Sequence, residues 1–172
     1  DLLRLYDATN DLRYKMYYGT PFGCTYGTKV AYNTSNGSDH GIRIAEAYLN
    51  RAEAFIRRSL ATGNDGDRVL ALNDLNVLRE TRYMTGSYVD EQITDANELL
   101  EFCLMERRLE LSLEEGFRWF DIKRLGLSVT HVYIDTEGVE REYILESNSP
   151  LYALPIPYDA IERNYRLEQN PR

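Results

Sequence analysis

The chain has 172 residues and a formal net charge of −8, with 43% apolar and 28% charged residues, as expected for a globular domain with its own core. The negative charge argues against nucleic acid or an anionic membrane surface as the main partner, because both attract clusters of Lys and Arg. No stretch approaches the roughly 18 consecutive apolar residues that suggest a transmembrane helix. The opening DLLRL already has a helical rhythm and lacks the features of a signal peptide, so we expect further residues upstream.

Residues 14–41 are rich in Gly, Thr, Asn and Ser, and this composition predicts an irregular or short-stranded segment. The whole chain has 14 Tyr against 5 Phe and 1 Trp, and six of the tyrosines fall within the first 40 residues. A tyrosine combines a stacking face with a hydroxyl group, which suits half-buried and ligand-binding positions.

The next stretch, residues 43–60, has the period of an amphipathic helix. Its apolar stripe consists of Ile44, Tyr48, Ala52 and Phe55, with Ala45, Leu49 and Ile56 alongside. Ser38 or Asp39 is the expected N-cap, and Gly63 is the expected C-terminal stop.

A second helix is predicted to follow, with Asp67 as N-cap. Its stripe is Val69, Leu72, Leu75 and Leu78. Two amphipathic helices joined by a short polar loop predict an antiparallel helix hairpin.

Thr94 or Asp95 is expected to open a third helix that runs to Gly116, and a shorter helix over residues 117–125 ends at Gly126. Two β-prone runs on either side of residues 135–138 predict a β-hairpin. The proline-rich tail predicts an extended path with a turn or two of helix at residues 159–163. The predicted fold class is mainly α with irregular loops and a small β-hairpin.

The stretch MERRLELSLEEGFRWFDIKRLG, residues 105–126, contains two glutamates, Glu110 and Glu114, at a spacing that places them on one helix face. Such a pair is compatible with glycosidase chemistry. Arg107 and Arg118, however, lie at helical spacing on either side of this pair. A nearby guanidinium lowers the pKa of a carboxyl group, whereas a general acid needs a raised pKa. We therefore favour an ion network that stabilises helices, with Trp119 as a packing residue.

The remaining patterns predict no catalytic residue, metal site or cofactor. The two histidines, His40 and His131, stand in no nucleophile elbow and no metal-binding helix motif, and no phosphate-binding loop is present. Cys103 falls in a helical apolar run and is expected to be a small buried residue, while a bridge to Cys24 stays open.

Loop tyrosines are the candidate ligand contacts, because no apolar period places them in a core; the alternative, that they are scattered surface or packing residues, stays open on the sequence. Aromatic faces beside amides and hydroxyls suit uncharged polyhydroxyl ligands. The candidate ligand-binding residues are Tyr17, Tyr18, Tyr26, Tyr83 and Tyr88.

Four motifs in a fixed order resemble the C-terminal region of the SusD/RagB family. They are RIAEAYLNRAEA (43–54), ALNDLNVLRETR (71–82), MERRLELSLEEGFRWFDIKRLG (105–126), and ALPIPYDAIERN with LEQNP (153–171). The resemblance covers residues 42–171, and residues 1–41 match chiefly through DLR at 11–13.

The resemblance implies an α-superhelix of tetratricopeptide-like helix pairs and a single domain, of which residues 1–172 are the C-terminal part. Within it we expect a loop-rich segment (1–41), a helical core (42–126) and a hairpin with a proline-rich tail (127–172). The family implies a non-enzymatic outer-membrane lipoprotein, surface-exposed and lipid-anchored through an N-terminal Cys, that binds glycans in polysaccharide utilisation. It hands them to a SusC-type TonB-dependent transporter for nutrient uptake. That Cys and the first part of the family's chain are not in this sequence, so no family sugar-binding residue is carried over.

Two other functions stay open on the sequence alone. A glycoside hydrolase would use the Glu110 and Glu114 carboxylates in a cleft. A helical-repeat scaffold would bind peptides in a groove lined by Asn50, Asn73 or Asn76.

Overall fold

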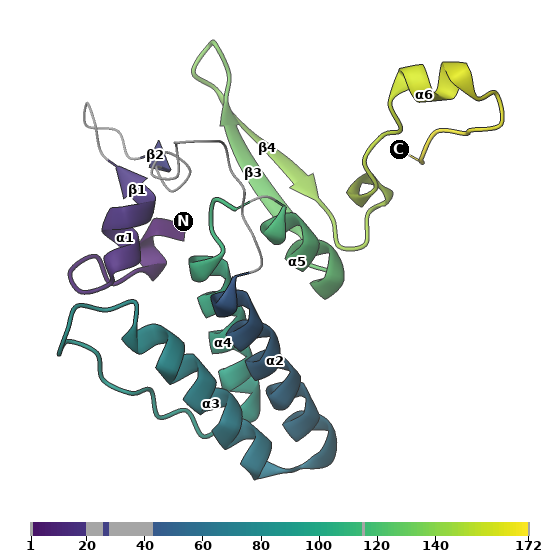
Figure 1. The fold of residues 1–172 in the computed structure, drawn as a ribbon. Helices are drawn as coiled ribbons and strands as arrows, with labels where there is room; N and C mark the ends of the chain where they lie inside the picture. Colours follow the sequence, from purple (N-terminus) through teal and green to yellow (C-terminus); the bar gives the residue numbers. More distant parts are fainter. Residues whose placement is uncertain (1, 20–25, 28–42, 115, 172) are drawn as a thin grey trace. The chain divides into compact units, whose positions relative to one another are not determined.

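The computed structural model describes residues 2–19, 26–27, 43–114 and 116–171, and for residues 19, 26 and 27 it describes the backbone alone. The chain divides into two compact units, Asp1–Glu115 and Gly116–Arg172 (Figure 1). The first unit carries three long helices, and the second carries a short helix, a β-hairpin and the tail. The predicted mainly-α class with a small hairpin is confirmed.

Three helices form the core of the first unit: α2 (Ile44–Thr62), α3 (Asp65–Glu80) and α4 (Ala96–Glu110). Helix α2 packs along both α3 and α4, as Figure 1 shows. The fully or nearly fully buried apolar side chains at their contacts are Leu49, Ala52, Ile56, Ala71, Leu75, Leu99, Cys103 and Leu109. The predicted helix hairpin is therefore the pair α2–α3, closed by Gly63 and Asn64.

The predicted stripes match the buried faces in part. In α2 Ala45, Leu49, Ala52 and Ile56 are buried as predicted, whereas Ile44 is 76% exposed. In α3 Leu75 and Leu78 are buried as predicted, whereas Val69 is exposed. The inner faces also hold acidic residues that pair with arginines, so the apolar pattern alone does not mark the whole contact.

The helix ends confirm some predicted caps and correct others. Gly63 ends α2 in the left-handed conformation, and Asp95 caps α4, accepting hydrogen bonds from the first-turn amides. Arg43 occupies the N-cap position of α2, so the cap predicted at Ser38 or Asp39, which lie outside the described residues, is wrong. The predicted cap Asp67 is also wrong, because Asn64 caps α3.

Short elements precede the helical core. They are η1 (Leu2–Leu5), α1 (Leu12–Tyr17) and the antiparallel pair β1 (Tyr18–Gly19) and β2 (Tyr26–Gly27). Asp11 caps α1 and also forms an isolated antiparallel bridge with Tyr83, which follows α3. The amide of Leu12 donates to the carbonyl of Arg82 at 2.9 Å, and the amide of Met84 donates to the carbonyl of Asn10 at 3.0 Å. This segment is thereby joined through its backbone to the loop that leaves α3.

The second unit begins with α5 (Phe117–Leu125), which ends at Gly126 as predicted. The predicted β-hairpin is also confirmed: β3 (Val129–Ile134) pairs with β4 (Glu140–Leu145) in antiparallel register, from Val129 opposite Leu145 to Ile134 opposite Glu140. The tail contains η4 (Pro150–Tyr152) and α6 (Tyr158–Arg163), where a short helix was expected. Trp119 has the predicted packing role, with its ring centroid 5.4 Å from that of Tyr152.

Candidate functional site

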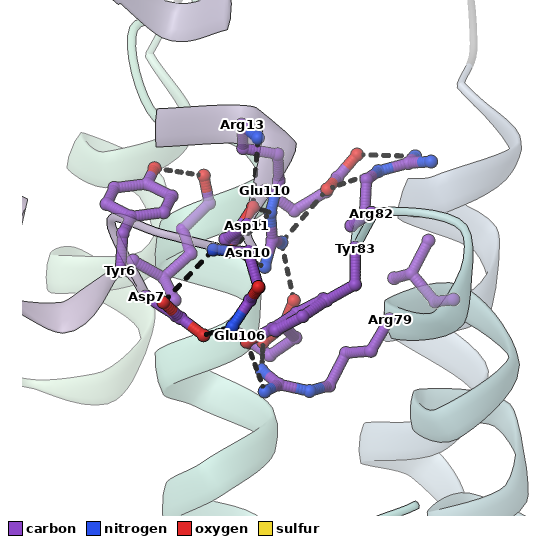
Figure 2. A network of polar contacts seen from close by, with 12 residues as sticks. Tyr6, Asp7, Asn10, Asp11, Arg13, Arg79, Arg82, Tyr83, Glu106 and Glu110 are labelled. Carbon is purple, nitrogen blue, oxygen red and sulfur yellow. Dashed lines mark hydrogen bonds and ion pairs between the residues drawn. The ribbon is translucent and has the colours of Figure 1, made fainter. Parts of the chain in front are cut away.

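The side chains of Glu106 and Glu110 lie one turn apart on α4, and both residues are 0% exposed. One guanidinium joins them: Arg13 Nη1 donates to Glu106 Oε1 at 2.5 Å and to Glu110 Oε2 at 3.2 Å. Asp11 holds the other side of that guanidinium, accepting from Nε at 3.0 Å and from Nη2 at 2.8 Å. Figure 2 shows this part of the cluster, in which the N-terminal segment reaches α4 through the buried Arg13, while the hydroxyl of Tyr6 in the same segment donates to the carbonyl of Leu109 at 2.7 Å.

Two arginines at the end of α3 pair with the same glutamates (Figure 2). Arg79 donates to Glu106 Oε2, and Arg82 donates through Nε and Nη2 to Glu110 at 2.9 and 2.8 Å. A bidentate guanidinium–carboxylate pair fixes orientation as well as distance. These contacts tie the end of α3 to α4.

A fourth arginine approaches from the start of α2. Arg43 Nη2 donates to Glu110 Oε1 at 2.6 Å, and the same side chain pairs with Glu114. We call the eight residues together the buried charge network. Its four acids are Asp11, Glu106, Glu110 and Glu114, and its four bases are Arg13, Arg43, Arg79 and Arg82. The formal charges therefore balance.

The network keeps Glu110 and Arg13 ionised. Burial alone would raise the pKa of Glu110, but the hydrogen bonds and charge of Arg82, with the charges of Arg13 and Arg43, lower it below its ordinary value. Burial would likewise lower the pKa of Arg13, and the carboxylates of Glu106 and Asp11 raise it instead. Glu110 is thus an ionised, fully enclosed acceptor and not a proton donor.

The sequence interpretation of residues 105–126 was correct that Glu110 and Glu114 are ion-paired, but the arrangement predicted along one helix, from Arg107 to Arg118, is wrong. Helix α4 ends at Glu110, so the predicted continuation of this helix to Gly116 is wrong, and Glu114 lies in the turns that follow. The arginines at Glu110 come from three other segments. Arg107 reaches across to α2, where its Nη1 donates to Asn50 Oδ1 at 2.7 Å.

Tyr83 and Tyr88 flank the network on its α3 side. Their ring centroids lie 5.2 Å apart, and the guanidinium carbon of Arg79 lies 5.1 and 5.7 Å from them. The ring of Phe102 lies 5.0 Å from the same carbon, so three aromatic rings surround one cation. Arg79 Nη2 also donates to the Tyr83 hydroxyl at 2.8 Å, while the Tyr88 hydroxyl donates to Asn76 Oδ1 at 2.6 Å. Both tyrosines remain half-buried.

The other predicted tyrosines lie at the N-terminal side of the network. Tyr17, the last residue of α1, is 8% exposed, and burial raises the pKa of its hydroxyl. Tyr18 is half-buried, with its ring centroid 5.8 Å from that of Tyr6. Tyr26 pairs through its backbone with Gly19, and its side chain lies outside the described part of the chain. The structure thus brings two pairs of candidate tyrosines to the network, Tyr17 with Tyr18 and Tyr83 with Tyr88.

Two asparagines of the hypothetical peptide groove, Asn50 and Asn76, accept hydrogen bonds from within the chain. Asn76 accepts from the Glu91 amide at 3.0 Å and from the Tyr88 hydroxyl, and Asn50 accepts from Arg107. His131 is exposed on β3, and Cys103 is buried with its thiol 3.9 Å from the carbonyl of Leu49. His40 and Cys24 lie outside the described residues.

Within the described ranges, no group of three or more His, Cys, Asp or Glu side chains is arranged to hold a metal ion. Among the same residues, no helix is both long enough and apolar enough to cross a membrane.

A helix hairpin with a third packed helix, a buried charge network on the glutamates of the stretch MERRLELSLEEGFRWFDIKRLG, and a β-hairpin followed by a proline-rich tail together define a SusD-like class of protein. The sequence profile of the SusD family matches residues 5–172, and the chain belongs to this family.

A curated relative agrees with that assignment, and a solved structure shares the fold. The chain is 32% identical over 130 residues to the SusD-like protein P38 of Formosa agariphila. The aligned stretch covers 74% of this chain and 23% of that protein. The structure is similar to that of a SusD-like carbohydrate binding protein from Bacteroides vulgatus, with a TM-score of 0.61 and 24% identity over 96% of this chain and 40% of that one. A SusD-like protein from Bacteroides fragilis shares 29% identity at a TM-score of 0.49, over 75% and 25% of the two chains. The chain spans less than a quarter of the length of its Formosa relative.

Proposed function

We propose that the protein to which this chain belongs binds oligosaccharides and does not cleave them. The observation that carries the proposal is the match of residues 5–172 to the SusD family. The description of the Bacteroides vulgatus protein as carbohydrate-binding supplies the class of ligand.

The state of the glutamates supports a binding role over hydrolysis. A glycosidase needs one protonated and one ionised carboxyl group beside the scissile bond. Glu110 is 0% exposed, its pKa lies below the ordinary value, and three arginines occupy its oxygens. Glu110, the buried member of the pair proposed from the sequence, therefore has neither the access nor the protonation state that a general acid requires.

The proposed ligand contacts are four of the five predicted tyrosines: Tyr18, Tyr26, Tyr83 and Tyr88. Of these, Tyr83 and Tyr88 have the strongest support, because their rings are held in one orientation around Arg79 and each remains half-buried. A ring fixed before binding loses little rotational freedom when a sugar stacks on it. Tyr17 is buried and would contribute by supporting Tyr18.

We further propose that the complete protein is a surface lipoprotein of the outer membrane and passes its ligand to a SusC-type TonB-dependent transporter. This part of the proposal is supported by the family alone. Co-purification of the full-length protein with such a transporter from detergent-solubilised membranes tests it, and a protein recovered only from the periplasm would exclude it.

Isothermal titration of the full-length protein tests the binding function. The panel consists of hexasaccharides of α-glucan, β-glucan, xylan and mannan. We expect one of them to bind, and Tyr88→Ala to weaken its binding about two- to tenfold, the range of one aromatic contact. Tyr165→Ala is the matched control, because Tyr165 is 87% exposed in the tail and should leave the Kd unchanged. Release of reducing ends by the wild-type protein would refute the non-enzymatic role.

A further inference from the structure

One carboxylate, that of Glu110, receives guanidinium groups from three separate stretches of the chain. Arg13 comes from α1, Arg43 precedes α2, and Arg82 follows α3. These arginines are 97, 67 and 28 residues away in sequence from Glu110. One buried carboxylate of α4, that of Glu110, therefore binds arginines from three separate segments.

Each of these segments borders candidate ligand tyrosines. Arg13 lies in the short helix that ends in Tyr17 and is followed by Tyr18, and Arg82 directly precedes Tyr83. Arg43 closes the same tyrosine-bearing stretch at its far end, where α2 begins. The two flanks of that stretch, before and after residues 18–42, are thus attached to the same carboxylate.

The contacts to Glu110 also constrain direction. Arg82 binds it through two nitrogens, and Arg13 is held between Glu110, Glu106 and Asp11. A planar guanidinium paired in this way has one orientation relative to the carboxylate plane. Two backbone hydrogen bonds, from the Leu12 amide to the Arg82 carbonyl and from the Met84 amide to the Asn10 carbonyl, join the segments that carry Arg13 and Arg82.

From these contacts we infer that Glu110 is a positioning residue for the ligand-binding face. It sets the position of the segment ending in Tyr17 and Tyr18 relative to the loop carrying Tyr83 and Tyr88. The link to ligand binding rests on the proposed function, whereas the positioning itself concerns the unliganded protein.

The comparison of Glu110→Gln with Asp74→Asn in the full-length protein separates positioning from a general loss of stability. Asp74 is also buried and pairs bidentately with Arg51 at 2.7 Å, but this pair joins α2 to α3 and contacts neither tyrosine segment. The readout is hydrogen exchange at the amides of Leu12 and Met84. In Glu110→Gln we expect both to exchange at least about tenfold faster, because the local opening that exposes them becomes easier. In Asp74→Asn they should keep the wild-type rate.

Wild-type exchange at both amides in Glu110→Gln, or equal acceleration in Asp74→Asn, would overturn the inference. Should Glu110→Gln fail to fold, Arg82→Gln takes its place, because it removes two of the bonds to Glu110 and leaves the carboxylate paired with Arg13 and Arg43. Faster exchange of Leu12 and Met84 in Arg82→Gln supports the inference, and unchanged exchange refutes it.

A second readout connects positioning with binding. The hexasaccharide of the panel that binds the wild-type protein most tightly should bind Glu110→Gln more weakly and Asp74→Asn with the wild-type Kd. If no hexasaccharide binds the wild-type protein, the proposed function fails for these ligands, and the exchange experiment still decides whether Glu110 positions the two segments.

Discussion

Replacing Glu106 by Gln removes a charge on which two buried arginines depend. Glu106 is 0% exposed and accepts from Arg13 at 2.5 Å and from Arg79. Glutamine has the same shape, but one of its two terminal groups is a donor and faces a guanidinium. Removing one partner of a buried ion pair costs about 3–5 kcal/mol, because the other charge is left uncompensated.

The structure places the expected loss near the lower end of that range. Arg13 keeps its contacts with Asp11 and Glu110, and Arg79 keeps the Tyr83 hydroxyl and a 3.3 Å contact to Glu91. Neither arginine is therefore fully stranded. We expect Glu106→Gln to lower the free energy of unfolding by about 3 kcal/mol.

Urea unfolding of the full-length protein, followed by far-UV circular dichroism, measures this loss. The matched control is Glu101→Gln, an exposed glutamate of the same helix, with an expected change within about 0.5 kcal/mol. In the double variant with Arg79→Gln the loss should be smaller than the sum of the two single losses, because both charges of the pair Glu106–Arg79 are then removed together. A loss for Glu106→Gln no larger than that of Glu101→Gln would refute the reasoning.

Three further predictions concern caps and pH. Gly63→Ala should cost about 1–2 kcal/mol of unfolding free energy, since Gly63 has φ +71° with open space around a Cβ, while Gly63→Asn should cost less in the same urea assay. Asp95→Ala should cost about 1 kcal/mol through loss of the α4 cap, against no change for the exposed Asp90→Ala. Because the pKa of Glu110 is lowered on folding, its stabilising contribution is present above the unfolded value of about 4.3 and is lost as the pH falls through the folded pKa. The melting temperature should therefore fall less between pH 7 and pH 3 for Glu110→Gln than for the wild-type protein.

The features that the sequence predicted correctly are those set by local backbone chemistry. Gly63 and Gly126 end their helices because each adopts positive φ, and Asp95 caps α4 because a carboxylate can accept its first-turn amides. The β-hairpin was recognisable because turn residues interrupt two β-prone runs. None of these features depends on residues far away in the chain.

The buried faces were predicted less well, for a reason visible on α3. Its inner face contains Asp67, Asp74 and Arg79 among the apolar residues. A stripe drawn through apolar residues alone passes these positions over and includes the exposed Val69 instead. The apolar period locates a helix reliably, but it locates the buried side only when that side is wholly apolar.

The partners of the glutamates could not be predicted from residues 105–126 alone. Arg13 lies 93 residues from Glu106, and nothing in the local pattern marks it as buried. A signal was nevertheless present: Glu106 and Glu110 recur at one helical turn, and Arg79 and Arg82 recur at nearly the same interval in the preceding helical region. Arg79 lies in the last turn of α3 and Arg82 just beyond it, and their side chains pair with the two glutamates one turn apart on α4.

Stability alone does not account for this arrangement. A buried ion network is often no more stable than well-packed apolar residues of the same volume, because desolvation offsets much of the attraction. Apolar contacts, however, have little directionality, whereas the carboxylate of Glu110 fixes three guanidiniums at defined angles. The proposed recognition of a sugar by stacking needs aromatic rings held in a defined relative position, and Glu110 joins the segment that leads to Tyr18 to the one that leads to Tyr83. The network supplies that directionality, and Glu110, enclosed and ionised, can do so without acting on the proposed sugar ligand.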